Sequence, residues 1–291
     1  RLKSLPHRSY RCLPCRGRCE ILTHRKKLIG RPARAKKTAV PAQSPRESRA
    51  RIYRHGMIPK QILADLAAAA DSKKAVELKR FFKTGPGEYG EGDRFRGIVV
   101  PVLRALARKH GGQSAGSCEA LLHSPWHEDR LLALMILAGN FERANVAGQR
   151  AIYRLYLANT ARINNWDLVD LSAPDIPGEW LLDRPKTPML RLARSGGLWE
   201  RRIAMVASHA WIRQGRFDDA LAIAAILLND RHDLIHKATG WMLREIGKRD
   251  LSAEESFLRR HCRAMPRTAL RYAIERFPEE QRLAWLRGTH P

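Results

Sequence analysis

Apolar side chains recur every three or four positions along nearly the whole chain from residue 58 onward. This spacing is typical of amphipathic helices, because residues three and four apart share one helix face. Gly, Pro, Asn or Asp separates the segments, and almost none alternates with the period of two expected of a half-buried strand. The pattern predicts an all-α protein with helices over residues 61–71, 73–82, 99–110, 117–124, 128–141, 148–161, 201–215, 218–230, 234–250, 253–262, 267–277 and 279–287.

Four of these helical segments share a basic or polar residue followed by small and apolar residues. The shared pattern begins near Arg130, Arg202, Lys237 and Thr268, at spacings of 72, 35 and 31 residues, and the first spacing is about twice the others. Antiparallel helix pairs that repeat every ~30–45 residues are typical of an α-solenoid. We therefore expect a curved array of HEAT-like helix pairs, with basic residues on its concave surface.

A glycine-rich segment, KTGPGEYGEGDRFRG at residues 83–97, interrupts the helical pattern. It lacks the Gly-Lys-Ser/Thr of a phosphate-binding loop, and Glu88, Glu91 and Asp93 would repel phosphates. Nucleotide binding is therefore not expected. The segment is interpreted as a long connection between helices that becomes ordered near a ligand.

Composition divides the chain into two parts. Residues 1–56 contain 17 Lys and Arg but only two acidic residues, and this Arg-, Pro- and Ser-rich segment lacks clear periodicity. It is predicted to be a disordered basic extension. Its origin could be an organelle transit peptide, a basic arm that binds phosphates, or upstream sequence translated ahead of Met57, and we favour the last. Residues 57–291 are predicted to form the single folded domain.

The charge of the folded part indicates the class of partner. Residues 57–291 contain 37 basic and 27 acidic residues, a net charge of +10 within a total of +25. Nucleic acid is the expected partner of such a domain, ahead of an acidic membrane surface. The longest apolar run, ALAIAAILL at residues 220–228, is much shorter than the ~18 residues that span a bilayer. No transmembrane segment is expected.

The five cysteines predict neither a disulfide framework nor a metal centre. Three lie in the N-terminal extension and could form half of a zinc site with a nearby histidine: Cys12, Cys15 and Cys19, with His7 or His24. A second CxxC or HxxxH motif is missing, so a solvated tail is expected instead. The other two, Cys118 and Cys262, lie in helical segments and are interpreted as reduced core residues, which indicates a reducing compartment.

One short amphipathic segment, INNWDLVDLSAP at residues 163–174, carries candidate chemistry. Trp166 and Asp170 are four residues apart and would lie on the same side of a helix. Asp167 lies at the predicted helix start, where Asn164 or Asn165 could cap and where an acid suits the helix dipole. Asp167 is therefore explained by its position, whereas Asp170 needs another reason.

Several motifs taken together resemble one known family. They are KTGPGEYGEGDRFRGIVVPVLR, NNWDLVD, LWERRIAMV, HKATGWMLREIGKRD and MPRTALRYAIERF, and their order and spacing extend over nearly all of residues 57–291. In this respect the chain resembles the DNA alkylation repair glycosylases of the AlkD type, which are built from HEAT-like repeats. The resemblance implies a bacterial enzyme that cleaves the N-glycosidic bond of N3- and N7-alkylated purines in duplex DNA, without metal or organic cofactor.

The resemblance also implies roles for individual residues. It makes Asp170 the catalytic carboxylate, Trp166 and Trp241 two aromatic walls, and Arg202 a contact to the DNA backbone beside the carboxylate. An aromatic residue that the family contributes from its first helices has no secure counterpart here, and Tyr89 is the candidate. The residues before the second Trp motif, Asp233-Leu234, also depart from the family pattern, which affects the expected lesion contacts more than the chemistry. Trp126, Trp180, Trp199, Trp211 and Trp285 are interpreted as core or packing residues.

The assigned residues suit this chemistry. An alkylated purine is already a cationic leaving group, so the main difficulty is the positive charge that develops on the sugar, which a nearby carboxylate would stabilise. Two other classes remain open from the residues alone, a non-catalytic HEAT-like DNA-binding protein and a protein-interaction scaffold. The isolated acid favours the enzyme over the first, and the basic domain argues against the second. We expect a monomeric, cytoplasmic, nucleoid-associated protein whose partner is duplex DNA.

Overall fold

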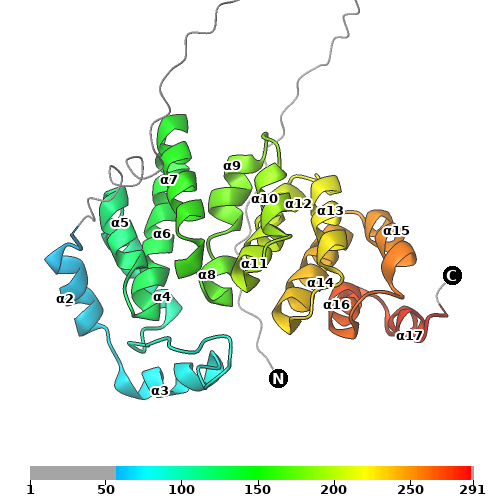
Figure 1. Ribbon diagram of the computed structural model, residues 1–291, viewed down its shortest axis with the longest axis horizontal. Coiled ribbons are helices and arrows are strands. Elements are labelled where there is room, and N and C mark those ends of the chain that lie inside the picture. The colour runs from blue at the N-terminus through cyan, green and yellow to red at the C-terminus, as the bar shows by residue number, and fades with distance from the viewer. Residues whose placement is uncertain (1–56, 290–291) are drawn as a thin grey trace, which may run out of the picture. The chain divides into compact units, whose positions relative to one another are not determined.

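The computed structural model describes residues 57–289, and within this range helices joined by loops make up the fold, with no β-sheet (Figure 1). The all-α prediction is confirmed, whereas the N-terminal extension and its cysteines lie outside the described residues. The helices are α2 Lys60–Ala68, α3 Ser72–Phe81, α4 Val100–Lys109, α5 Ala115–Leu122, α6 His127–Arg143, α7 Val146–Ala158, η1 Thr160–Arg162, α8 Trp166–Asp170, η2 Pro174–Gly178, α9 Glu179–Leu181, α10 Thr187–Leu192, α11 Leu198–Ala207, α12 His209–Arg213, α13 Asp218–Leu227, α14 Asp233–Gly247, α15 Leu251–His261, α16 Arg267–Ala273, η3 Ile274–Arg276 and α17 Glu279–Arg287.

Five successive units form one continuous row of packed helices. In this row α6 contacts α8 and η2, these contact α11, α11 contacts α14, and α14 contacts α16 (Figure 1). A second set, α5, α10, α13 and α15, packs against the row from outside, each on a helix next to it in sequence. This stack of helix pairs is the α-solenoid arrangement.

The repeat pattern read from the sequence corresponds to this row. The four positions that mark the pattern lie on α6, α11, α14 and α16. The double spacing between Arg130 and Arg202 contains the unit formed by α8, η2 and α9, whose sequence does not show the pattern. This irregular unit, a five-residue α-helix followed by a π-helix, carries Trp166 and Asp170.

Side-chain caps fix where several helices begin. Oxygen atoms of Asp71, Ser114, Asn145, Asn165 and Asp250 accept backbone N–H groups from the first turns of α3, α5, α7, α8 and α15, respectively. Each cap satisfies a donor that the helix itself leaves unpaired, which stabilises the helix by about 1 kcal/mol. At α8 the cap accepts the backbone N–H of Trp166 itself, at 2.8 Å.

The predicted helix over residues 201–215 is wrong in one respect, since two helices occupy this region. α11 ends at Ala207, and the buried hydroxyl of Ser208 donates to the carbonyl of Met205 at 2.6 Å, after which α12 begins. A serine that hydrogen-bonds backward along a helix competes with the regular backbone pattern. The break directs Trp211 into the core, where its Nε1 donates to the carbonyl of Gly178 at 2.9 Å.

The interpretation of five tryptophans as core or packing residues agrees with the structure, with three of them in the core. Trp180, Trp211 and Trp285 are buried. Trp126 and Trp199 are only half-buried, and each lies beside the glycine-rich segment or its anchor: the guanidinium of Arg96 lies 4.8 Å above the ring of Trp126. Of the two helical cysteines, Cys118 is fully buried and Cys262 is half-buried.

The glycine-rich segment forms the ordered connection between α3 and α4. Two of its acids bind the loop itself: Glu88 accepts from the backbone N–H of Gly85 at 2.8 Å, and Glu91 accepts from that of Gly87 at 2.9 Å. Gly97, with a φ of 82°, lies so close to the carbonyl of Asp71 that a Cβ would come within 1.9 Å of its oxygen. Only glycine fits there, and this close approach fastens the end of the loop to the start of α3.

Candidate functional site

The centre of the candidate site is an ion pair between α8 and α11. Nε and Nη2 of Arg202 donate to Oδ1 and Oδ2 of Asp170 at 2.9 and 2.7 Å, and Nη1 donates to the carbonyl of Leu234 at 2.5 Å. The Arg202 side chain is 6% exposed and that of Asp170 is 17% exposed. The two-pronged contact fixes the plane of the carboxylate and leaves an edge of it open to solvent.

Opposing influences act on the protonation of Asp170. Burial raises the pKa of this carboxyl above its ordinary value, and the negative charge of Asp167 raises it further, whereas the charge and hydrogen bonds of Arg202 lower it. A guanidinium that donates to both oxygens favours the ionised form. The site therefore holds a desolvated carboxylate whose charge depends on the neighbouring groups.

An aromatic cluster lies beside this carboxylate, around Trp166 at the first position of α8. Its indole packs against Phe82, with ring centroids 5.3 Å apart, and meets Phe81 edge to face at 5.8 Å. Phe82 is buried, but Phe81 is 56% exposed. The cluster therefore places an exposed aromatic ring, Phe81, next to Trp166.

Phe81 and Phe82 are site residues that the sequence analysis missed. The available indication was a pair of consecutive aromatics, FF, directly before the glycine-rich segment. Periodicity explains only one of the two, since adjacent residues on a helix cannot both face the core.

Tyr89, the candidate aromatic of the first helices, lies next to the same cluster. Its ring is 6.0 Å from that of Trp199 on α11. Burial raises the pKa of Tyr89 above its ordinary value, against the opposing effects of the Trp166 side chain and of the positive charge of Lys237. The glycine-rich segment thus reaches α11 at Tyr89.

The fourth predicted site residue, Trp241, lies further along α14. It is seven residues beyond Leu234, or ~10 Å along the helix axis. Its indole is half-buried and lies 5.8 Å from the ring of His209, a residue of α12 rather than of the α8 pair. The structure therefore brings together Trp166, Asp170 and Arg202, and the role of Trp241 remains a prediction.

A buried polar cluster lies next to α8, around the side chain of His127. His127, at the first position of α6, lies between two carboxylates: its Nε2 is 2.7 Å from Oδ2 of Asp167 and its Nδ1 is 3.2 Å from Oδ2 of Asp93. Asp93 also accepts from Nη2 of Arg130 at 2.6 Å and from Nδ2 of Asn165 at 3.2 Å. The expectation that the helix start alone explains Asp167 is incomplete, because this residue also joins α8 to α6.

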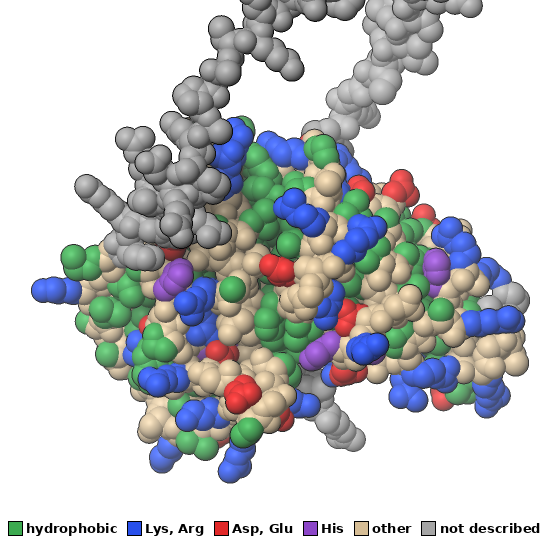
Figure 2. Space-filling view, viewed as in Figure 1, with side chains coloured by type: hydrophobic (Ala, Val, Ile, Leu, Met, Phe, Trp, Pro, Cys, Tyr) green, Lys and Arg blue, Asp and Glu red, His purple; other side chains and the backbone are tan. Residues whose placement is uncertain are grey.

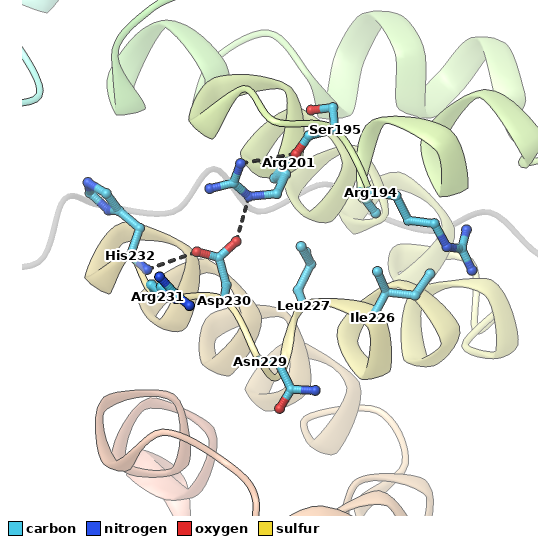
Figure 3. A pocket seen from close by; sticks show the side chains of 10 residues that line it. Arg194, Ser195, Arg201, Ile226, Leu227, Asn229, Asp230, Arg231 and His232 are labelled. Atoms are coloured by element: carbon cyan, nitrogen blue, oxygen red, sulfur yellow. Dashed lines mark hydrogen bonds and ion pairs between the residues drawn. The ribbon is translucent and has the colours of Figure 1, made fainter.

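A second Asp–Arg pair lies on the neighbouring face of α11. Nε of Arg201 is 2.5 Å from Oδ2 of Asp230, and its Nη1 donates to the carbonyls of Ser195 and Gly196. The pair forms part of the wall of an open pocket of about 580 Å³ between the loops that precede α11 and α14 (Figure 3). Consecutive residues of α11 thus make two ion pairs with aspartates, Arg202 through two hydrogen bonds and Arg201 through one.

The family model described as DNA alkylation repair enzyme matches residues 62–277. The chain belongs to this family. The match contains every residue of the site described above, and it shows that the chain has a role in the repair of alkylated DNA, with DNA as substrate or partner.

The chain also resembles a solved structure in its fold. That structure is titled "Predicted DNA alkylation repair enzyme from Enterococcus faecalis", and the likeness has a TM-score of 0.56 at 17% sequence identity, covering 72% of this chain and 97% of the other. At this identity the likeness shows the fold alone. A comparison with curated proteins finds no matching relative.

The described residues were also compared with the features of membrane-spanning helices and of metal sites. No helix within them is long and apolar enough to cross a membrane. Within the same range, no three His, Cys, Asp or Glu side chains are grouped so that they could hold a metal ion. The cysteine-rich segment at residues 12–19 lies outside this range.

Proposed function

We propose that this DNA alkylation repair enzyme is an AlkD-type glycosylase that hydrolyses the N-glycosidic bond of N3- or N7-alkylated purines in duplex DNA, with Asp170 as the catalytic carboxylate. The observation that carries the proposal is the geometry of Asp170: a largely buried carboxylate, oriented by two hydrogen bonds from Arg202, lies beside a partly exposed aromatic cluster. A protein that only bound the DNA backbone would gain nothing from a negative charge held in this way.

The carboxylate supplies what the reaction needs. Loss of a cationic purine leaves positive charge on the sugar, and a carboxylate near the anomeric carbon attracts that charge and aligns the attacking water. At ~4 Å and an effective dielectric of ~20 the attraction is about 4 kcal/mol. Because Arg202 opposes part of this field, that figure is an upper bound, equivalent to roughly a thousandfold in rate.

Arg202 orients the carboxylate in this scheme. The resemblance implies a contact between this arginine and the DNA backbone, but its guanidinium is largely buried and already donates to Asp170 and to the carbonyl of Leu234. Its main role is therefore to hold Asp170 in one rotamer and favour its charged form.

The aromatic cluster supplies the surface for the alkylated nucleotide. Trp166 and the exposed ring of Phe81 are aromatic groups whose faces attract cationic bases by about 0.5–2 kcal/mol per contact. Trp241 is the second predicted aromatic wall. The partial exposure of the cluster suits recognition from the backbone side, without a deep pocket for a rotated base.

The distribution of charge favours duplex DNA as the partner. Residues 57–291 have a net charge of +10, and in Figure 2 Lys and Arg side chains lie over α3 at one end and over α16 and α17 at the other. Neutralising several phosphates in this way supplies most of the sequence-independent affinity for DNA. We further propose that residues 57–291 act as a monomeric catalytic unit in the bacterial cytoplasm, at the nucleoid.

The experiment compares base release by the wild type and by Asp170→Asn. Duplex DNA that contains N7-methylguanine is incubated with excess enzyme, and the free base is counted. We expect Asp170→Asn to lower the single-turnover rate by about 10²–10³-fold while DNA affinity stays within a few fold. The matched control is Asp230→Asn, which breaks the ion pair on the adjacent face of α11 and should leave base release nearly unchanged.

Two results would decide against the glycosylase. Equal base release by Asp170→Asn and the wild type would remove Asp170 from the reaction. Tight DNA binding without any base release by the wild type would favour the alternative, a non-catalytic HEAT-like DNA-binding protein.

A further inference from the structure

The imidazole of His127 occupies an unusual position, enclosed between two carboxylates and only 2% exposed. A neutral imidazole has one N–H and one lone pair, so it can donate to only one of two flanking carboxylates. Here Nδ1 faces Asp93 and Nε2 faces Asp167, at 3.2 and 2.7 Å. Only the doubly protonated ring satisfies both contacts, so the geometry requires an imidazolium.

The electrostatic environment agrees with this geometry. Burial lowers the pKa of His127, but the charge of Asp167, its hydrogen bond and those of Asp93 outweigh burial and raise the pKa to about 9. Two cations, His127 and Arg130, then balance two anions, Asp93 and Asp167, in the buried cluster. Loss of the imidazolium proton would leave one uncompensated negative charge in the protein interior, which is strongly unfavourable.

The cluster connects α8, which carries Asp170, to two elements that surround the site. Asp93 belongs to the glycine-rich segment, His127 to α6 and Asp167 to α8. The imidazole also packs against Phe82, with ring centroids 4.9 Å apart, and Phe82 in turn packs against Trp166. A change at His127 therefore reaches both the aromatic cluster and the helix that carries Asp170.

Asp167 transmits the charge of this cluster to Asp170. The two carboxyls are three residues apart on α8, and the negative charge of Asp167 raises the pKa of Asp170. We propose that His127 is a positioning residue: its imidazolium neutralises Asp167, which keeps Asp170 ionised, and it fastens α8 to the glycine-rich segment. The effect of His127 on catalysis rests on the proposed glycosylase function, whereas its effect on the charge of Asp170 does not.

The remaining charged groups around His127 have other partners. On α6, the carboxylate of Glu128 accepts the backbone N–H groups of residues 96–98, and that of Asp129 accepts from the guanidinium of Arg96. On α11, Arg202 is bound to Asp170. Among the described residues that face the ring, the only carboxylates within ion-pair distance are Asp93 and Asp167, and the only other cation bound to them is Arg130.

The first test measures protonation in the full-length protein without any assay of activity. The ¹³C resonances of the histidine rings are followed by NMR between pH 5 and 10 and assigned with His127→Gln. We expect His127 to remain an imidazolium through pH 8 and to lose its proton near pH 9. A neutral His127 ring at pH 7 would overturn the proposal.

The second test measures the coupling to Asp170. The side-chain carboxyl ¹³C of Asp170 is titrated in the wild type, in His127→Gln and in the double variant His127→Gln/Asp167→Asn. The proposal predicts that the midpoint moves to higher pH in His127→Gln and returns toward the wild-type value in the double variant, because the uncompensated charge is then gone. An unchanged Asp170 midpoint in folded His127→Gln would overturn it. If His127→Gln does not fold, the wild-type His127 ring is assigned by through-bond correlation to its own backbone, and its titration still decides.

The third test uses the pH profile of base release. In His127→Gln the acid limb should move to higher pH, because the ionised fraction of Asp170 at a given acid pH falls tenfold when its midpoint rises by about one pH unit. The control is His110→Gln, which removes another buried histidine bound to an aspartate, Asp65, at 2.7 Å, and its acid limb should match that of the wild type. Equal displacement of the acid limb in both variants would show a general effect of lost stability and overturn the proposal. Absence of base release by the wild type would refute the glycosylase instead, and the two NMR titrations would still decide the charge relation.

Discussion

The Asp170–Arg202 pair allows a prediction that separates its contribution to folding stability from its contribution to the rate of base release. The perturbation is a double-mutant cycle made of Arg202→Ala, Asp170→Asn and the double variant. Arg202 makes two charge-assisted hydrogen bonds with Asp170 and one with the carbonyl of Leu234, and its side chain is only 6% exposed. Solvent screening of these interactions is therefore weak.

The expected magnitudes follow from this geometry. Removing one partner of a buried ion pair costs about 3–5 kcal/mol, because the other charge stays desolvated and unpaired. Arg202→Ala should therefore lower the free energy of unfolding by about 3–4 kcal/mol, which is roughly 10 °C in Tm for a domain of this size. Asp170→Asn should cost less, about 1–2 kcal/mol, because the neutral amide still accepts one hydrogen bond from Arg202.

The double variant gives the decisive value. With both charges gone, its loss of stability should be smaller than the sum of the single losses by about 1–3 kcal/mol. Urea unfolding at pH 7 measures the three differences. The same cycle on Arg201 and Asp230 gives the reference, because that pair also joins α11 to a buried aspartate, through one hydrogen bond instead of two. We expect coupling in stability for both pairs.

Base release should distinguish the two cycles. In the Asp170–Arg202 cycle both single variants should lose nearly all activity and the double variant should regain none, whereas the Asp230–Arg201 cycle should change activity little. Additive stability losses for Asp170 and Arg202, within about 0.5 kcal/mol, would refute the ion pair as a buried, oriented unit. Equal activity losses in both cycles would refute its special role in the reaction.

Three further predictions address the surroundings of the site. Phe82→Ala should lower the free energy of unfolding by about 3–5 kcal/mol in urea unfolding, because Phe82 is buried. Phe81→Ala should cost below about 1 kcal/mol and instead weaken binding of lesion-containing DNA about 5–100-fold in a fluorescence titration. The reverse assignment of the two effects would exclude Phe81 as a contact residue. The folded-state pKa of His127, about 9, lies above the ordinary value of about 6.5, so its contribution to stability is complete below pH 6.5 and is lost as pH rises to 9. Wild-type stability should thus fall by about 3 kcal/mol over this range relative to His127→Gln, and parallel pH dependence of the two proteins would contradict this. Deletion of residues 1–56 should leave the rate of base release within about twofold, and a loss above tenfold would make the extension part of the functional protein.

The fold follows directly from local features of the sequence. Apolar spacing at three and four residues and caps such as Asp71, Ser114 and Asp250 define helices by interactions within a few residues, so a linear reading finds them. The repeat pattern likewise appears on successive helices of one row, because each of these helices packs against equivalent neighbours. The break after Ala207 was not predicted, since a single serine hydroxyl that donates backward along the helix decided it.

The candidate site shows where a linear reading stops. The family motifs and the four-residue spacing indicated Trp166 and Asp170, and the structure places Arg202, 32 residues further on, against Asp170 with both hydrogen bonds of a guanidinium fork. Phe81 looked like an ordinary helical aromatic, because exposure of one of two adjacent rings depends on what the rest of the chain covers.

Sequence alone therefore determined the class of fold, its repeat, the family and the short helix that carries the carboxylate, because local spacing defines the helices and the order of motifs along the chain defines the repeat and the family. Tertiary structure decided the state of that carboxylate. The groups that act on its charge are Arg202 of α11 and Asp167 of α8, and Asp167 is in turn bound to His127 of α6, which is far from it in the sequence, because electrostatic energy depends on distance and burial in space. For the same reason His127, one of 11 histidines in the sequence, becomes distinctive only when Asp93 and Asp167 are seen on either side of its ring.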